Sequence, residues 1–78
     1  MGRLGRDEEA LESYDKAIEI NPDYELAWYN RGVSLEQLDR DEEALESYDR
    51  VIKINPENDL AKQKMEEIHS KRSTNDFN

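Results

Sequence analysis

The sequence predicts a single all-α domain in which about four helices pair as antiparallel hairpins. The first observation is an internal repeat, because residues 6–15 recur without a change as residues 40–49, at an offset of 34 residues. The second is that apolar residues in each copy recur at the spacing of one helix face. The third is a composition of 40% charged and 35% hydrophobic residues, which provides enough apolar side chains for a small core but not for a core of several layers. The domain is expected to span residues 1–71.

Each copy of the repeat is predicted to hold one amphipathic helix, over about residues 7–20 and 41–54. Acidic residues begin each helix, where they face the positive end of the helix dipole. An Asn-Pro pair ends each helix, because the residue before Pro is pushed out of the helical region. The expected apolar faces consist of Ala10, Leu11, Tyr14, Ala17 and Ile18 in the first copy and of Ala44, Leu45, Tyr48, Val51 and Ile52 in the second.

A helix over about residues 24–38 is predicted between the two copies, with Asp23 as its cap. Its apolar residues cover two faces, so we expect it to be packed on both sides. Gly32 in its middle costs about 1 kcal/mol relative to Ala unless a close contact needs the missing side chain, so Gly32 predicts a tight helix crossing. The two faces consist of Tyr24, Trp28, Leu35 and Leu38 and of Leu26, Tyr29 and Val33.

The connection at residues 38–41 has two interpretations. Residues 36–41 contain neither Gly nor Pro, so residues 24–54 can be read as one continuous helix that exchanges halves between two chains, a domain swap. The other interpretation is a turn. It is favoured because Asp tolerates turn conformations and because the acidic residues from Asp41 onward suit a helix start.

A fourth helix is predicted over about residues 58–71. A narrow apolar stripe runs among charged residues there, which is typical of a terminal helix with one wet face. Residues 72–78 are mostly polar, and we expect them to form a disordered or frayed tail. The stripe consists of Leu60, Ala61, Met65 and Ile68.

Small, aromatic and Pro residues recur at fixed positions of the 34-residue period: Trp28, Gly32, Ala44, Tyr48 and Pro56 in one full copy, and Ala10, Tyr14 and Pro22 in a partial copy. This pattern resembles the tetratricopeptide repeat over residues 4–57. The resemblance implies an α-solenoid fragment of helical hairpins, with Tyr14, Tyr48 and Trp28 in the core. Two residues depart from the family signature. Arg31 replaces Leu and is expected to reach solvent or pair with an acidic neighbour, and Leu35 replaces Tyr.

The resemblance also implies a non-enzymatic protein–protein interaction module. In tetratricopeptide proteins the first helices of successive repeats line a concave groove that takes extended peptides or partner helices. The groove type that clamps a C-terminal carboxylate is not expected, because Tyr29, Val33 and Leu60 stand where that type has Lys, Asn and Lys. The groove positions, which are equally compatible with plain packing or solvent exposure, fall on Leu26, Tyr29, Asn30, Val33, Glu36, Gln37, Gln63, Lys64 and Glu67.

No catalytic, cofactor or metal site is predicted. The chain has no Cys and a single His, His69, which removes thiolate sites and the usual zinc ligand sets. Adjacent carboxylates such as Glu8 and Glu9 point apart on a helix, so we expect them to be solvated. Ser13 and Ser47 lie in predicted helices without a His or Cys partner, and the three Gly residues form no phosphate-binding loop.

The net charge of −9 also limits the classes of partner. It repels phosphate backbones and anionic lipid surfaces, so neither nucleic acid nor a membrane is expected as a partner. The longest hydrophobic run, residues 26–29, is far shorter than a membrane-spanning helix. We expect a protein or peptide partner and a cytoplasmic location.

Self-association is the alternative function. Repeat arrays need about three repeats for a continuous core, and the first helix has no helix before it to pair with. Part of the face with Leu11, Tyr14 and Ile18 is therefore expected to stay exposed to solvent in a monomer. Burial of these side chains favours a homodimer, either an ordinary one or a domain-swapped one. The near-identity of the two copies is also compatible with a consensus-like engineered scaffold, and the sequence leaves open whether it is a natural full-length protein or a piece of a longer array.

Overall fold

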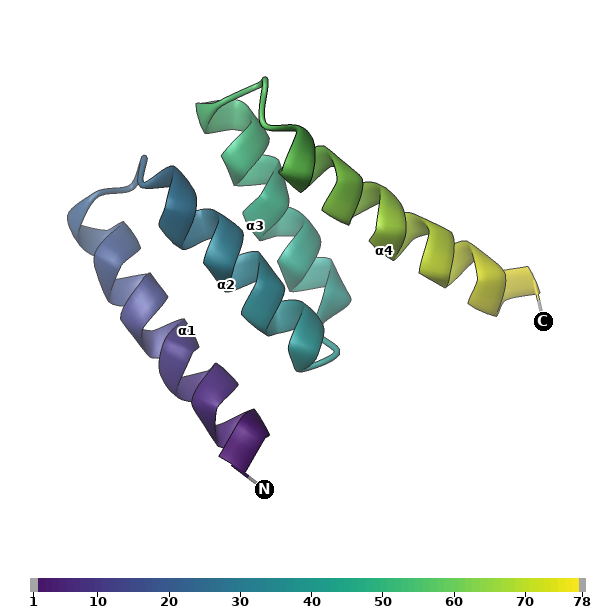
Figure 1. Ribbon diagram of the computed structural model, residues 1–78, viewed down its shortest axis with the longest axis horizontal. Helices are drawn as coiled ribbons and strands as arrows, with labels where there is room; N and C mark the ends of the chain where they lie inside the picture. Colours follow the sequence, from purple (N-terminus) through teal and green to yellow (C-terminus); the bar gives the residue numbers. More distant parts are fainter. Residues whose placement is uncertain (1, 78) are drawn as a thin grey trace.

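In the computed structural model the chain forms four helices and no strand within residues 2–77, the part whose backbone the structure describes; side chains are described for residues 6–71. This confirms the predicted all-α fold of about four helices. The helices are α1 (Gly2–Ile20), α2 (Glu25–Gln37), α3 (Asp41–Ile54) and α4 (Asp59–Phe77), and they are labelled in Figure 1.

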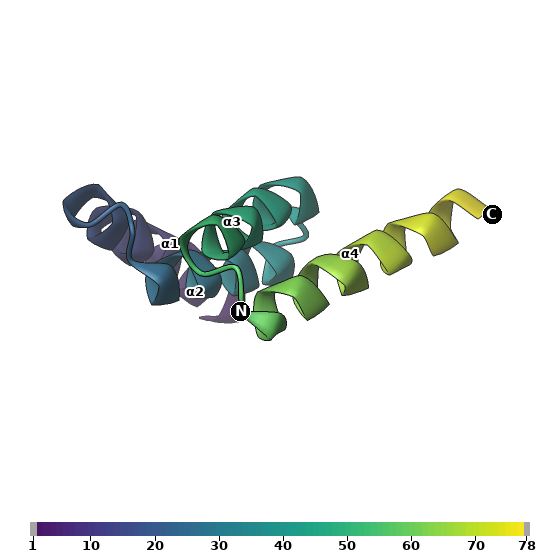
Figure 2. The same cartoon turned by 90° about the horizontal axis from the view of Figure 1, so that it is seen from above.

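The four helices form a row of antiparallel hairpins. Each helix packs mainly against the next one in the chain, α1 on α2, α2 on α3 and α3 on α4. The molecule is flat, with principal extents of 42 × 36 × 15 Å. Figure 2 shows that α4 points away from the other three helices. The two middle helices are therefore enclosed between neighbours, whereas α1 and α4 are each packed on one side.

The centre of the core lies on α3. Tyr48 is fully buried, and its ring lies against Gly32 on α2. A Cβ atom added to Gly32 would lie 2.5 Å from Cε1 of Tyr48, which is closer than real side chains approach. The predicted tight crossing at Gly32 is confirmed. The other buried members of the core cluster are Leu11, Leu35, Ala44, Val51, Ala61 and Ile68.

The connection between α2 and α3 is a tight turn. Asp39 has a φ of 62°, which is the left-handed conformation found after many helix ends. The N–H of Arg40 donates to the carbonyl of Leu35 at 2.8 Å, and the N–H of Asp39 donates to the carbonyl of Glu36 at 3.0 Å. These two bonds form a Schellman motif, which satisfies the last carbonyls of α2. The turn, rather than a continuous helix over residues 24–54, is the interpretation that the structure supports.

The start of α2 corrects the predicted cap. The N-cap residue is Tyr24, and no side chain caps the first amides of the helix. Asp23 lies one residue too early to do so, and its own N–H donates to Oδ1 of Asn21 at 3.2 Å within the turn. Trp28 Nε1–H instead donates to the carbonyl of Pro22 at 2.8 Å. This bond ties the first turn of α2 to the Asn-Pro turn that ends α1.

The two end helices are longer than predicted. α1 begins at Gly2 rather than near residue 7, and α4 continues to Phe77 rather than ending near residue 71. Neither extension contains Pro, and a Gly lowers helix propensity without preventing a helix. The backbone of the expected frayed tail is therefore helical up to Phe77, and Asn78 lies outside the described residues.

α4 begins at Asp59, within one residue of the predicted start. Asn58 stands directly before the helix, and its Oδ1 accepts the N–H of Ala61 at 3.1 Å. This is the N-cap bond that satisfies one of the four free amides of a helix start.

Arg31 connects three helices. Its Nε donates to Oδ1 of Asp15 on α1 at 2.8 Å, and its NH1 donates to Oγ of Ser47 on α3 at 2.6 Å. Its guanidinium and that of Arg50 both lie near the Trp28 ring, at 5.6 and 5.1 Å from the centroid. The guanidinium of Arg31 is thus paired with an acidic neighbour, as predicted. It also donates a hydrogen bond to the hydroxyl of Ser47, which is buried.

Candidate partner-binding surface

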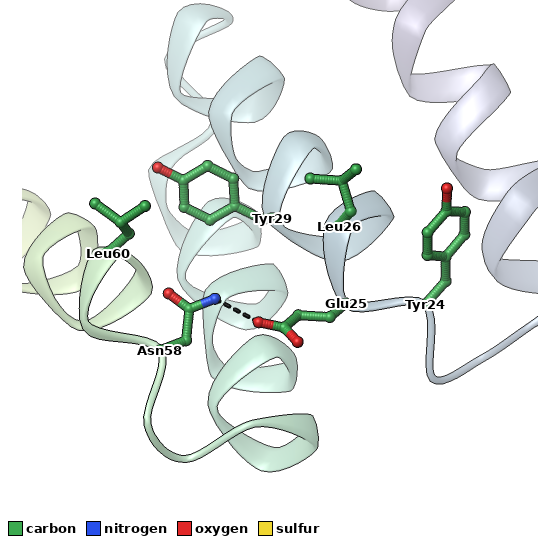
Figure 3. A pocket seen from close by; sticks show the side chains of 6 residues that line it. All are labelled: Tyr24, Glu25, Leu26, Tyr29, Asn58 and Leu60. Atoms are coloured by element: carbon green, nitrogen blue, oxygen red, sulfur yellow. Dashed lines mark hydrogen bonds between the residues drawn. The ribbon is translucent and has the colours of Figure 1, made fainter.

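An apolar hollow lies between the N-terminal ends of α2 and α4 (Figure 3). It has a volume of about 400 Å³ and is open to solvent. We call it the groove pocket. Its walls consist of Tyr24, Glu25, Leu26, Tyr29, Asn58 and Leu60.

Glu25 holds the two sides of the groove pocket together. Its Oε2 accepts hydrogen bonds from Nδ2 of Asn58 at 2.6 Å and from Nδ2 of Asn55 at 3.1 Å. Figure 3 shows the first of these bonds reaching across from α2 to the segment before α4. These charge-assisted bonds, which are stronger than neutral ones, join the start of α2 to the segment before α4.

Apolar side chains remain uncovered around the groove pocket. Leu26 is 57% exposed, Leu60 is 60% exposed and Tyr24 is 43% exposed. Leu60 follows Leu26 by 34 residues, so the two leucines occupy the same place in successive units of the repeat. Apolar side chains that stay exposed next to a hollow are typical of a binding surface rather than of a core.

Tyr29 forms a rigid wall of the groove pocket. Its ring packs on the fully buried Tyr48, with centroids 5.7 Å apart and an interplanar angle of 55°. The hydroxyl of Tyr48 donates to Oε2 of Glu36 at 2.7 Å. Burial, followed by this bond to a carboxylate, raises the pKa of Tyr48 well above the usual value for tyrosine. The ring of Tyr29 is therefore supported by Tyr48, a buried residue whose hydroxyl is itself hydrogen-bonded.

The predicted groove residues fall into three groups. Leu26 and Tyr29 line the groove pocket. Glu36 on α2 and Glu67 on α4 meet at a separate hollow of about 110 Å³ near the other end of α2. The remaining predicted positions do not line the groove pocket: Asn30, Val33 and Lys64 are half-buried, and Gln37 and Gln63 are exposed.

Four residues of the groove pocket were not among the predicted site residues, namely Tyr24, Glu25, Asn58 and Leu60. Leu60 was assigned to the apolar stripe of the last helix, but it is exposed. The 34-residue offset from Leu26 is the signal that identifies it. The contact between Glu25 and Asn58 joins residues 33 positions apart, and no local pattern signals it.

No group of three or more His, Cys, Asp or Glu that could hold a metal ion occurs among the described residues. No helix in the described part of the chain is long and apolar enough to cross a membrane.

Comparison with known proteins gives the family. A family model described as "TPR repeat" matches residues 3–39, and a second, described as "Tetratricopeptide repeat", matches residues 26–58. The chain belongs to the tetratricopeptide repeat family. Tetratricopeptide repeats are generally protein–protein interaction modules, and the helical hairpins of α1 to α4 follow their architecture.

A curated relative is similar over part of the chain. It is a protein of Methanocaldococcus jannaschii described as uncharacterized, and it is 47% identical over 38 residues. The match covers 49% of this chain and 44% of the relative, so this tetratricopeptide chain matches less than half of the relative's length.

Proposed function

We propose that this protein is a non-enzymatic, cytoplasmic module that binds a partner polypeptide in the groove between α2 and α4, with the groove pocket as the anchoring site. The observation that carries the proposal is the group of exposed apolar side chains, Tyr24, Leu26 and Leu60, around a hollow whose two sides are joined by hydrogen bonds to Glu25. A rigid apolar pocket binds with little loss of conformational entropy, because its side chains are already ordered. Pockets of this kind accept the one or two anchor residues that dominate binding energy.

The charge of the protein defines the chemistry of the proposed partner. The net charge is −9, and Glu25 and Glu67 carry acidic groups to both ends of the groove. A partner segment with an apolar anchor flanked by Lys or Arg is therefore favoured, since electrostatic attraction speeds its association. An acidic segment is repelled within a Debye length of about 8 to 10 Å.

The test is a selection of peptides from a random library, with purified full-length chain as the target. Peptides that bind the wild-type chain are then measured against Leu26→Asp, which places a charge in the groove pocket. Ile20→Asp is the matched control, because Ile20 is an apolar residue of α1 that is 85% exposed and lies outside the pocket. We expect Leu26→Asp to weaken binding by about tenfold or more and Ile20→Asp to change it little.

The selected sequences test the chemistry separately. Enrichment of one apolar residue next to Lys or Arg supports the proposal. Selected peptides that bind both Asp variants equally well, or that are predominantly acidic, contradict it.

Self-association is a second candidate function. The observation that favours it is that Tyr14 and Ile18 on the end helix α1 are only half-buried. Leu11, by contrast, is buried against the core, so only part of the face with Leu11, Tyr14 and Ile18 is exposed to solvent. Molar mass measured over a concentration series distinguishes the cases: a rise toward the dimer mass supports self-association, and a monomer mass at hundreds of micromolar contradicts it.

A further inference from the structure

A second hollow lies on the two middle helices. It has a volume of about 340 Å³, and its walls consist of Trp28 on α2 and of Glu46, Asp49 and Arg50 on α3. We call it the Trp28 hollow. It shares no lining residue with the groove pocket. Because α2 and α3 each have a packed helix on both sides, this hollow is not the free side of an end helix (Figure 1).

Arg50 is held against the indole ring of Trp28. Its guanidinium carbon lies 5.1 Å from the ring centroid, which is within the range of a cation–π contact. The ring is itself fixed, since its Nε1–H donates to the carbonyl of Pro22 at 2.8 Å. Stacking on an aromatic face leaves the N–H groups at the edge of the guanidinium available for hydrogen bonds. Arg50 is therefore pre-organised although it is exposed.

Arg50 has no hydrogen bond or ion pair of its own within residues 6–71, the part whose side chains are described. Glu46 lies four residues earlier, at the spacing of a helix ion pair, but the guanidinium lies near the ring instead. Asp49 pairs with Lys53, with 3.2 Å between Oδ2 and Nζ. The fork of N–H donors on Arg50 is thus open to a carboxylate of another molecule, which it can bind through two parallel bonds.

The two copies of the repeat differ in the residues near this hollow. Residues 6–23 and 40–57 differ at four of 18 positions. Arg50 stands where the first copy has Lys16, and Lys53 stands where it has a Glu. Both residues of the second copy also line a neighbouring hollow of about 330 Å³. Since Arg stacks on a ring and binds a carboxylate with two N–H groups, whereas Lys does not, the exchange gives α3 an anion-binding chemistry that α1 lacks.

We infer that the Trp28 hollow is a second docking site, which binds a partner segment that has an apolar side chain beside a carboxylate and a Lys or Arg. The apolar side chain packs on Trp28, the carboxylate binds the guanidinium of Arg50, and the cation faces Glu46. Glu46 and Arg50 are one helical turn apart, about 6 Å along the axis, so the two charges of the partner have a similar separation. A segment with both charges is favoured over a purely acidic one, because the protein carries a net charge of −9.

The test is a selection from a random peptide library without Trp, with the full-length Leu26→Asp variant as the target. This substitution places a charge in the groove pocket, so the selected peptides report on other surfaces. Trp28 is the only Trp of the chain, and its fluorescence therefore reports binding at the hollow. We expect peptides that carry Asp or Glu next to an apolar residue, and a saturable change in Trp emission when they are titrated.

Arg50→Gln and Lys16→Gln, both in the Leu26→Asp background, are the matched variants. Each removes one exposed cation at the same position of the repeat, but Arg50 is the one that contacts Trp28. We expect Arg50→Gln to weaken binding by about tenfold or more and Lys16→Gln to change it little. Arg50→Lys keeps the charge without the two-bond geometry, so it should weaken binding several-fold. Helicity measured by circular dichroism must be the same for all three variants.

A charge exchange tests the pairing of Arg50 with the peptide carboxylate. Arg50→Glu should no longer bind the selected peptides. Peptides with Lys in place of the acidic residue should bind Arg50→Glu at least about tenfold more tightly than they bind the protein with Arg50. A general loss of structure in the variant would not produce this reversal.

Three results would overturn the inference. The first is a selection that enriches no peptide with a carboxylate. The second is binding of the selected peptides that Arg50→Gln leaves unchanged. The third is binding that leaves the Trp28 emission unchanged. The proposed function stands or falls separately, because it concerns peptides that bind the wild-type chain and lose affinity for Leu26→Asp.

Discussion

α1 and α3 contain ten consecutive identical residues, but only α3 is packed on both sides. Tyr48 is fully buried, bonded to Glu36 and pressed against Gly32, whereas Tyr14 in the same sequence is half-buried on an end helix. The comparison shows that a helix sequence specifies a face, and that the neighbouring helices decide whether the face becomes core. In this molecule one copy of the face is fully buried in the core, whereas the other is only half-buried.

The largest expected difference between the two copies concerns their tyrosines. Tyr48→Ala removes a fully buried ring and leaves the Glu36 carboxylate without its donor, so it should lower the free energy of unfolding by about 3 to 5 kcal/mol. Tyr14→Ala should cost no more than about 1.5 kcal/mol, because part of that ring is already in water. Urea denaturation of both variants measures the difference, and equal losses would show that the two faces are equally packed.

The crossing at Gly32 gives the second prediction. Gly32→Leu should destabilise the chain by about 1 to 3 kcal/mol through overpacking against Tyr48, despite the better helix propensity of Leu. Gln37→Leu, at an exposed position of the same helix, is the control and should change stability little. A stabilised Gly32→Leu variant would refute the close approach of α2 and α3.

The third prediction concerns alkaline pH. The pKa of Tyr48 is raised in the folded state, so its contribution to stability is fully present below the unfolded pKa of about 10 and is lost as the pH rises above it. Between about pH 8 and about pH 11 the loss should approach about 1.4 kcal/mol, since each unit above the unfolded pKa is worth that amount. In Tyr48→Phe this part of the loss should disappear, while the other three tyrosines contribute to both proteins. The same pH dependence in both proteins would contradict the raised pKa.

The smallest expected effect lies at the turn between α2 and α3. Asp39→Gly should stabilise the chain by about 0.5 to 1 kcal/mol, because Gly adopts the left-handed conformation at φ 62° more easily. Asp39→Ala removes the carboxylate but keeps Cβ, so it should give no such gain. A destabilised Asp39→Gly variant would show that the Asp side chain itself holds the turn.

The sequence predicts the parts of the fold that depend on local patterns. The predicted ends of α3 agree with the structure, and the start of α4 and the ends of α2 differ from it by about one residue, because Pro, acidic first turns and apolar spacing act within a few residues. The Gly32 crossing was also predictable, since an unexplained Gly inside a helix needs a close neighbour. The cap of α2 was not, because the helix begins one residue later than expected, with Tyr24 as N-cap, and Asp23 belongs to the preceding turn, where its N–H donates to Asn21.

The candidate site was predictable only in part. Leu26 and Tyr29 follow from their place in the repeat. The rest of the groove pocket depends on how the segment before α4 folds back on Glu25, through bonds from Asn55 and Asn58 that span 30 and 33 residues. Contacts between residues so far apart in the sequence depend on how whole helices pack. They cannot be predicted from the spacing of residues within one helix.

The direct test of the contrast between α1 and α3 is thiol reactivity in single-cysteine variants. The chain has no Cys, and Ser13 and Ser47 stand in identical local sequence from seven residues before to two residues after. Intrinsic reactivity is therefore matched in Ser13→Cys and Ser47→Cys, and any difference reports the packing around each thiol. We predict that a soluble maleimide labels Ser13→Cys nearly as fast in the folded chain as in urea, and labels Ser47→Cys slower by orders of magnitude. Equal protection of the two positions would contradict the account, because the face of α1 would then be as closed as that of α3.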